Sequence, residues 1–315
     1  MLGATGSTGP IVCVGEAMAV LTPAQDVPLR DAAEFVRSVG GAELNVALTL
    51  AGLRVPAAWL SRLGDDGFGR HVGSVAEAAG VNVAAVEYDA TRPTGLYVKA
   101  PGTASDGSRR SAMLYYRDGS AASALSPAYL RRPDVARALR DAAVVHISGI
   151  TPGLSDDAAA FCDALPAARG GAALTVDLNY RPALWRDRDD AALRRLLDAA
   201  DEVLLGADEA IAVFGTADPG ALRKALPHAQ RILLKQEEHG VLVLGDTALH
   251  VPALDVDVVE PVGAGDAFAA GYLAGRWYDL DVRSAVVLGH RCAAAALVVR
   301  EDRPVTLPAW EDLVA

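Results

Sequence analysis

Two glycines, an aspartate and the start of a helical pattern lie together in the stretch from Val262 to Phe268. Glycine can adopt backbone angles closed to other residues, so Gly263 and Gly265 allow successive amide N–H groups to turn toward one point. The helical run from Ala267 to Trp277 adds its free N-terminal N–H groups and positive dipole end to that point. This stretch therefore predicts a binding site for an anion such as a phosphoryl group.

Asp266 lies at the rim of this predicted anion site. A carboxylate there could accept the proton of a hydroxyl that is held against the bound phosphoryl group. The alternative is that Asp266 only caps the helix, because aspartate is among the favoured N-cap residues. At a helix N-terminus we expect the carboxylate to be ionised and only weakly basic. Weak basicity suffices, because phosphoryl transfer through a loose transition state depends mainly on positioning and charge stabilisation.

A second glycine pair, Gly40-Gly41, opens a helical pattern that carries Asn45. Without side chains at the pair, a polar substrate can approach the backbone closely, and Asn45 offers both a donor and an acceptor. The alternative is an ordinary tight turn between a strand and a helix.

Two arginines could bind an anionic substrate. Arg117 ends a predicted hairpin beside Tyr115, and Arg181 follows a predicted core strand. If both face the same cleft, two guanidinium groups can bind one carboxylate. The alternative is that each arginine forms a surface or structural ion pair.

Short apolar runs typical of strands alternate with helical patterns along most of the chain. The pairs are 11–15 with 43–53, 57–63 with 69–79, 144–148 with 155–168, 174–178 with 189–200, and 202–205 with 208–214; a further strand is expected at 256–259. Such an alternation predicts an α/β fold with a doubly wound, mostly parallel sheet. Two segments, 18–39 and 95–117, offer strands without helices, the second as a hairpin around 102–110. Together they predict a small sheet that serves as a lid.

The composition of the chain argues against several classes of protein. The 315 residues carry a net charge of -11 and a pI near 5.0, which argues against nucleic acid or an anionic membrane surface as the main partner. Apolar runs fall short of the roughly 18 residues of a membrane span. The three cysteines and six histidines show no metal-binding spacing. Residues 1–10 lack the features of a secretory signal, so we expect a disordered leader on a cytoplasmic enzyme.

The two glycine-containing stretches resemble the two signatures of the ribokinase-like (PfkB-type) sugar kinases. The first is Gly40 to Ala47 followed by Gly64 to Gly69, and the second is Pro261 to Phe268. The resemblance covers residues 11–315 and implies a ribokinase-like sheet flanked by helices, with lid strands from about 16–40 and 92–118. It also implies ATP as phosphoryl donor with Mg²⁺, Asp266 as catalytic base, and the amides of Gly263, Ala264 and Gly265 as the anion hole.

Further motifs are similar to those of 2-keto-3-deoxygluconate kinases within this family. They are 93–97, 115–121, 148–152 and 177–185. The resemblance implies that a sugar acid is phosphorylated at its 6-hydroxyl and that the galactonate epimer is a second candidate substrate. The substrate-binding residues would be Gly40, Gly41, Asn45, Tyr97, Tyr115, Arg117 and Arg181, with the two arginines at the carboxylate.

The nucleotide side departs from the family pattern. Lys235 and Gly240 match a nucleotide-binding loop, His290 lies where asparagine is common, and Glu209 matches the acidic position linked to the metal. Gly206 replaces a usual Asn or Ser, whereas Glu237 and Glu301 replace usual glycines. A kinase for a neutral sugar or nucleoside, and a sugar-acid sensor without turnover, therefore stay open as alternatives. A monovalent cation and a homodimer through the lid are compatible with the family but not specified by the sequence.

Overall fold

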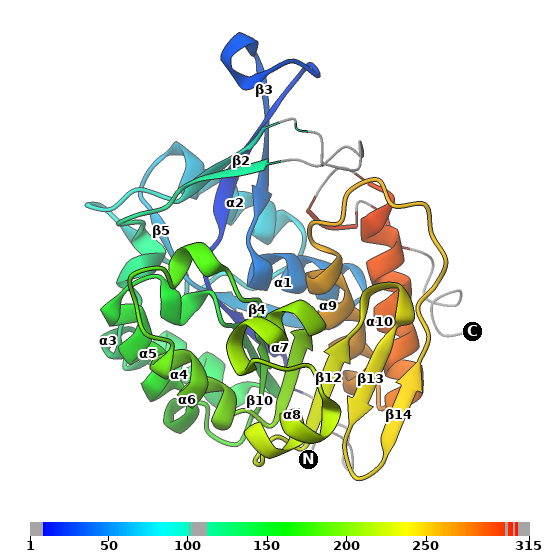
Figure 1. The fold of residues 1–315 in the computed structure, drawn as a ribbon. Helices are drawn as coiled ribbons and strands as arrows, with labels where there is room; N and C mark the ends of the chain where they lie inside the picture. The colour runs from blue at the N-terminus through cyan, green and yellow to red at the C-terminus, as the bar shows by residue number, and fades with distance from the viewer. Residues whose placement is uncertain (1–8, 101, 103–111, 300–301, 305, 308–315) are drawn as a thin grey trace.

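The computed structural model describes residues 9–100, 102, 112–299, 302–304 and 306–307. A large sheet forms the middle layer, and helices cover both of its faces (Figure 1). Helices α1, α2, α9 and α10 pack on one face around one apolar core, whereas α3 to α8 pack on the other face around a second core. This arrangement confirms the predicted α/β fold.

The large sheet has eight strands in the order β14-β13-β12-β11-β10-β9-β1-β4. The six strands from β12 to β4 run parallel, and β13 and β14 are antiparallel additions at one edge. Its members are β1 (Ile11–Val14), β4 (Ala57–Leu60), β9 (Val144–Ser148), β10 (Ala173–Asp177), β11 (Glu202–Gly206), β12 (Arg231–Lys235), β13 (Val241–Leu244) and β14 (Ala248–Val251). The central strands are buried on both faces, which explains why they appear in the sequence as continuous apolar runs.

The α-helices follow the strands closely. They are α1 (Ala42–Gly52), α2 (Gly67–Ala78), α3 (Pro127–Leu130), α4 (Pro133–Asp141), α5 (Asp156–Ala168), α6 (Ala191–Asp198), α7 (Ala207–Phe214), α8 (Pro219–Ala225), α9 (Ala264–Trp277) and α10 (Val282–Leu297). Several begin at side-chain caps: Asp66, Ser155 and Asp281 each accept a hydrogen bond from a first-turn amide. No helix in the described ranges is long and apolar enough to cross a membrane.

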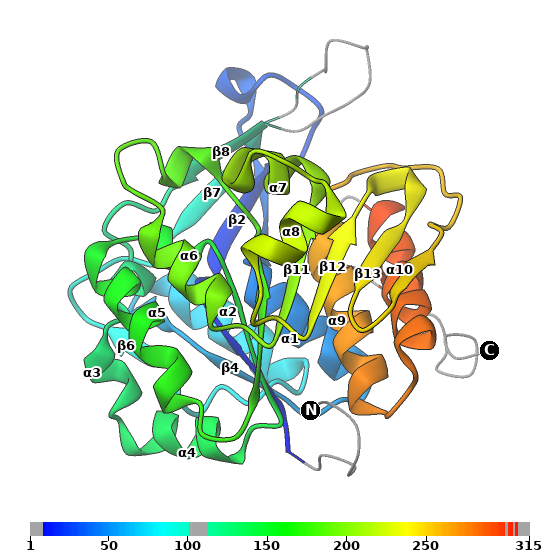
Figure 2. The same ribbon diagram turned by 60° about the horizontal axis from the view of Figure 1, so that its bottom comes forward.

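A second sheet of four strands stands beyond the end of the large sheet, on the side away from the N-terminus (Figures 1 and 2). It contains β2 (Met18–Pro23), β3 (Phe35–Gly40), β7 (Leu96–Ala100) and β8 (Ala112–Tyr116) in the order β3-β2-β7-β8. These strands come from the two segments predicted for the lid. The turn predicted for this hairpin at 102–110 lies, apart from residue 102, outside the described residues. Because β1 leads directly into β2, the lid stands at the carboxyl end of the parallel strands.

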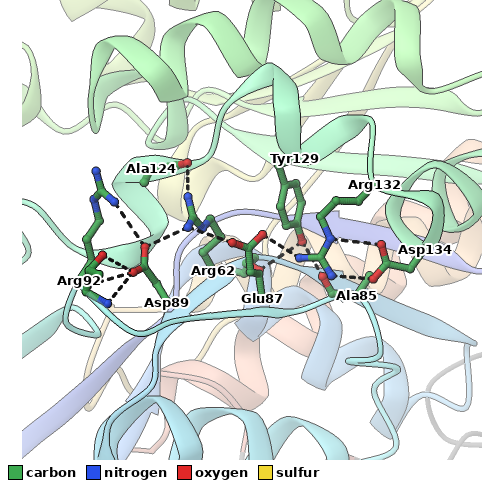
Figure 3. Close-up of polar contacts among 11 residues, drawn as sticks. Arg62, Ala85, Glu87, Asp89, Arg92, Ala124, Tyr129, Arg132 and Asp134 are labelled. Carbon is green, nitrogen blue, oxygen red and sulfur yellow. Dashed lines mark hydrogen bonds and ion pairs between the residues drawn. The ribbon is translucent and has the colours of Figure 1, made fainter.

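A small sheet of β5 (Arg62–Gly64) and β6 (Glu87–Asp89) connects the large sheet to the root of the lid. Figure 3 shows its ion-pair network, in which Arg62 lies 2.9 Å from both Glu87 and Asp89 and donates to the Ala124 carbonyl. Asp89 also accepts from the backbone amide of Thr91 at 2.8 Å, which fixes the start of the loop that enters β7.

The expected strand at 256–259 needs correction. Val258 and Val259 are exposed, and within the described residues only the Val259 amide of this stretch has a backbone acceptor, the carbonyl of Leu297. The predicted leader, 1–10, lies mostly outside the described residues. Its last two residues pack against the fold, since the carbonyls of Gly9 and Pro10 accept hydrogen bonds from Trp277 and Ala143.

Candidate active site

Asp266 lies in the first turn of α9, which begins at Ala264 rather than at the predicted Ala267. The N-cap is Gly263, whose φ of 83° lies in the left-handed region and lets the helix start three residues earlier. The carboxylate does not cap the helix. It accepts a hydrogen bond from the side-chain amide of Asn45 at 2.8 Å and one from Asn179 at 3.4 Å.

The two asparagines come from different elements at the carboxyl end of the sheet. Asn45 lies in the first turn of α1, the helix that begins directly after the Gly40-Gly41 pair. Asn179 follows β10 and has a φ of 39°. Each turns its NH₂ group toward Asp266, and the side-chain oxygen of each is buried without a hydrogen-bond partner among the described residues. A sugar hydroxyl could donate to these two oxygens.

Desolvation raises the pKa of Asp266 to about 6. Its hydrogen bond from Asn45 opposes this shift, the charge of Asp177 adds to it, and Arg181 and Lys235 oppose it. The expectation of an only weakly basic carboxylate is therefore wrong, because that argument counted the helix dipole and left out burial. A carboxylate of this pKa is ionised at neutral pH and still accepts a proton more readily than an exposed aspartate.

Lys235 ends β12 and lies beside the first turn of α9. Its ammonium contacts the Asp177 carboxylate at 2.9 Å and lies 3.6 Å from the position that a Cβ on Gly265 would take. Burial alone would lower the pKa of Lys235, but Asp177 and Glu209 outweigh it and raise the pKa. A permanently charged ammonium therefore stands next to the predicted anion hole.

The predicted anion hole consists of the first backbone amides of α9. The first amides of α9 lack intrahelical acceptors, as at any helix start. The amide of Ala264 donates to the Pro261 carbonyl at 3.3 Å, so an anion would have to replace that bond at this position. Only glycine fits at 263, because a Cβ would collide with the backbone of Asp302.

The acidic residue expected near the metal, Glu209, is mostly buried in the first turn of α7. Its two oxygens accept from the backbone amides of Gly206 at 2.8 Å and Tyr180 at 3.1 Å. Gly206 is the N-cap of α7 and has no side chain with which to accept a hydrogen bond from the first-turn amides. In the described ranges no group of three His, Cys, Asp or Glu side chains could hold a metal. Mg²⁺ still fits, because this ion is commonly held by one or two carboxylates, water and substrate phosphates.

Tyr97 lies on lid strand β7, and its buried side chain is hydrogen-bonded through its hydroxyl to Asp302. A Cβ at Gly40 would collide with that hydroxyl, and one at Gly41 with the Glu16 carbonyl, so both glycines are required sterically. The ammonium of Lys99, buried on β7, forms an ion pair with Asp302. A tyrosine hydroxyl, a carboxylate and an ammonium thus lie together between the lid and the start of α1.

Tyr115 and Arg117 line a cavity of about 790 Å³ between the lid and the start of α2. Arg117 pairs with the buried carboxylate of Glu16, whereas the half-exposed Arg181 lies 3.8 Å from Glu209. The structure therefore gives the two arginines different protein partners, and a shared carboxylate stays a prediction. The other lining residues are Arg37, Asp66, Gly67, Phe68, Pro93, Thr94, Leu96, Tyr116 and Asp118; Asp266 and Arg181 do not line this cavity.

On the predicted nucleotide side, Gly240 has a φ of 98° and no room for a Cβ beside the Val251 carbonyl. Glu237 is exposed and has a φ of 51°, a conformation that glycine adopts at a lower free-energy cost. His290 is buried, with its Nε2 3.3 Å from the Val251 carbonyl and its ring against Phe268. Contacts of these residues with ATP stay predictions, and Glu301 lies outside the described residues.

Asn179, Lys99 and Asp302 belong to this site but were not predicted from the sequence. Asn179 carried a readable signal, since a polar residue directly after a buried parallel strand lies at the edge where ligands bind. Asp302 contacts Tyr97 across 205 residues of sequence, and nothing in the local pattern around either residue indicates that contact.

The model of the pfkB family of carbohydrate kinases matches residues 9–309. The chain belongs to this family. It is therefore a phosphotransferase that acts on a hydroxyl group. Its fold is shared by the crystal structure of a PfkB protein from Polaromonas sp. JS666, with a TM-score of 0.83, 29% identity, and coverage of 97% of this chain and 99% of that one.

Relatives in this family phosphorylate different sugars. The chain is 37% identical to a 2-dehydro-3-deoxygluconokinase of Thermoproteus tenax, over 93% of this chain and 89% of the relative. It is 30% identical to a 2-dehydro-3-deoxygalactonokinase of Haloferax volcanii, over 96% and 95%. Fructokinases are among the relatives as well. Similarity alone thus supports a sugar kinase, and it does not decide which sugar is phosphorylated.

Proposed function

We propose that this carbohydrate kinase transfers the γ-phosphoryl group of ATP to the 6-hydroxyl of 2-keto-3-deoxygluconate, which is the same compound as 2-dehydro-3-deoxygluconate. The observation that carries the chemistry is the environment of Asp266, with two asparagine donors, the amides of α9 and the ammonium of Lys235 around it. The similarity to 2-dehydro-3-deoxygluconokinases supports the substrate.

In this proposal Asp266 accepts the proton of the attacking hydroxyl. Asn45 and Asn179 orient the carboxylate, and their free oxygens bind hydroxyls of the sugar. The first-turn amides of α9 and the ammonium of Lys235 stabilise the charge on the transferred phosphoryl group. Mg²⁺ would neutralise the phosphate oxygens of ATP, and Glu209 is the carboxylate proposed to bind it through water.

The carboxylate of the substrate would lie under the lid, where Tyr97, Tyr115 and Arg117 are the proposed contacts. Arg117 supports this placement because its Nε is buried and has no hydrogen-bond partner in the described ranges. A carboxylate could fill that position. The galactonate epimer is a second proposed substrate, because a site that binds mainly the carboxylate distinguishes the epimers weakly.

A neutral-sugar kinase is the alternative with a specific observation behind it. The charge of Arg117 is already balanced by Glu16, so an anionic substrate is not required to neutralise it. A sensor without turnover has less support, since the proposed base, ammonium and amide cradle are all present.

The deciding experiment measures ADP release with ATP and Mg²⁺ through a coupled assay. The sugars compared are 2-keto-3-deoxygluconate, 2-keto-3-deoxygalactonate, fructose, ribose, adenosine and gluconate. We expect the highest kcat/KM with a keto-deoxy acid. Better turnover of fructose would establish the neutral-sugar alternative, and no release with any sugar would return the sensor to consideration.

We also propose that the lid mediates a homodimer. The exposed apolar side chains of Phe35, Val36 and Tyr116 lie on lid strands, where a second copy would bury them. Sedimentation of the protein with Val36→Asp or Tyr116→Asp tests this: the variants should be monomeric, and an unchanged mass would place the contact elsewhere.

A further inference from the structure

The carboxylate of Glu16 joins three of the four roots of the lid. Glu16 lies between β1 and β2, and its oxygens accept hydrogen bonds from the guanidinium of Arg117 and the hydroxyl of Ser120, both just after β8. The third root is Gly95, before β7, where a Cβ would lie 2.9 Å from the same carboxylate. A side chain at this position would force the Glu16 carboxylate and the side chain of Met18 to shift.

Both members of the Glu16–Arg117 pair are buried. The exposed fraction of the side chain is 1% for Glu16 and 8% for Arg117. A buried charge that loses its partner is strongly unfavourable, so the pair holds each side chain in one orientation. The hydroxyl of Ser120 occupies the second oxygen of Glu16, which leaves that carboxylate little freedom to rotate.

One nitrogen of the Arg117 guanidinium is bonded to Glu16, and another has no partner within the described ranges. Its Nη2 donates to Glu16, whereas its Nε is buried without a partner among the described residues. The ring of Tyr115, a further proposed substrate contact, lies 5.5 Å from the centre of the guanidinium. A planar guanidinium anchored at one nitrogen presents its remaining donors in a fixed direction.

We propose that Glu16 is a positioning residue for substrate recognition: it orients Arg117 so that the remaining donors of the guanidinium receive the carboxylate of the sugar acid. This inference rests on the proposed function, because it takes the sugar-acid carboxylate as the ligand of Arg117. It adds a residue that does not itself contact the substrate. The binding of the carboxylate then depends on a contact at the root of the lid.

The test compares Glu16→Gln with Ser120→Ala, using KM and kcat for 2-keto-3-deoxygluconate and KM for ATP. Glu16→Gln keeps the shape of the side chain and removes the charge that holds Arg117. We expect KM for the sugar acid to rise about tenfold, kcat to change less than about threefold, and KM for ATP to stay the same. Ser120→Ala removes the other partner of Glu16 and should raise KM for the sugar acid less than about threefold.

A double-mutant cycle with Arg117→Ala separates this inference from the proposed function. If Arg117→Ala leaves KM for the sugar acid unchanged, or if the acid is not a substrate, the carboxylate assignment fails and the inference fails with it. If Arg117→Ala raises KM and Glu16→Gln does not, only the positioning role fails. In the Arg117→Ala background, Glu16→Gln should have no further effect on KM, and full additivity would overturn the inference.

Two other outcomes also count against the proposal. A lower KM in Glu16→Gln would mean that Glu16 competes with the substrate for Arg117. A lower kcat together with a higher KM for ATP and a lower Tm would mean that Glu16 only stabilises the lid. Circular dichroism and thermal unfolding of each variant accompany the kinetics, and Glu16→Asp, which keeps the charge, should retain more affinity for the sugar acid than Glu16→Gln.

Discussion

Asp266 shows how opposing effects set the chemistry of one carboxylate. Burial favours its neutral form, whereas the hydrogen bond from Asn45 and the charges of Arg181 and Lys235 favour the ionised form. The resulting pKa of about 6 places the residue near the operating range of a general base at neutral pH.

The pH dependence of kcat/KM should report this carboxylate in the free enzyme. Below about pH 6 Asp266 becomes protonated and can no longer accept a proton, so kcat/KM should fall about tenfold per pH unit. Asn45→Ala removes a donor that lowers the pKa, and the acid limb should therefore move to higher pH. Measurements of kcat/KM from pH 5 to 8 check both points, and an acid limb that Asn45→Ala does not move would exclude the assignment.

Replacing the base itself gives the second prediction. Asp266→Asn keeps the size of the side chain and should lower kcat by about 10²- to 10⁴-fold. Binding of the sugar, measured by calorimetry, should stay within a few-fold because the neighbouring asparagines still form the site. Near-normal turnover of the variant would remove Asp266 from the role of base.

Glu237 provides a prediction about stability. A side chain at its φ of 51° is strained by roughly 1 kcal/mol or more, and glycine removes that strain at some cost in chain entropy. We expect Glu237→Gly to raise the free energy of unfolding by about 0.5–1 kcal/mol. The neighbouring Glu238 is also exposed but has no positive φ, so Glu238→Gly is the matched control and should not stabilise the protein. Urea denaturation measures the difference.

Among the elements, the small β5–β6 sheet carries a network of ion pairs at the base of the lid (Figure 3). Arg62→Ala would leave Glu87 and Asp89 without their shared partner and should destabilise the protein by about 2 kcal/mol. Arg30→Ala removes an ion pair whose members are 85% and 55% exposed, and serves as the control with little expected effect. Equal effects of the two substitutions in urea denaturation would contradict a structural role for the network.

The same network makes part of the stability depend on pH. The pKa of Asp89 is lowered to about 2 by the Thr91 hydroxyl, two backbone amides and the charge of Arg62, although burial alone would raise it. A depressed carboxyl pKa stabilises the fold above the unfolded value near 4, and this contribution is lost as pH falls from about 4 to 2. Unfolding followed over that range should show a smaller pH dependence in Asp89→Asn than in the unchanged protein.

Element types were predictable where burial and periodicity agree. The strand runs 11–15 and 144–148 are apolar on both faces, and the structure places both in the parallel part of the sheet. Prediction failed where local pattern and tertiary contact disagree: 256–259 has the apolar residues of a strand, but the part of the chain that the structure describes offers no strand for it to pair with. The start of α9 was predicted late because the left-handed Gly263 gives no sequence signal beyond glycine itself.

Across the whole molecule, site residues that lie in signature motifs were predictable, and those brought in by distant contacts were not. Gly40, Asn45 and Asp266 could be selected from the sequence because each lies at a glycine-rich helix start. Lys99 and Asp302 could not be selected, because the ion pair between them forms only when the segment after α10 folds against lid strand β7. The pairing of Arg117 with Glu16 likewise needed the lid in place.

The bond between Asn45 and Asp266 joins residues 221 positions apart, which has a consequence for biosynthesis. At roughly 5–20 residues per second, a ribosome adds Asp266 on the order of ten to forty seconds after Asn45. From the addition of Tyr116 until α9 follows, the nascent chain carries the glycine pair and all the lid strands, but neither the base nor the amide cradle. A translation product that ends before α9 could therefore retain the sugar-facing surface while lacking the residues for phosphoryl transfer. Phosphoryl transfer then indicates that synthesis has passed α9.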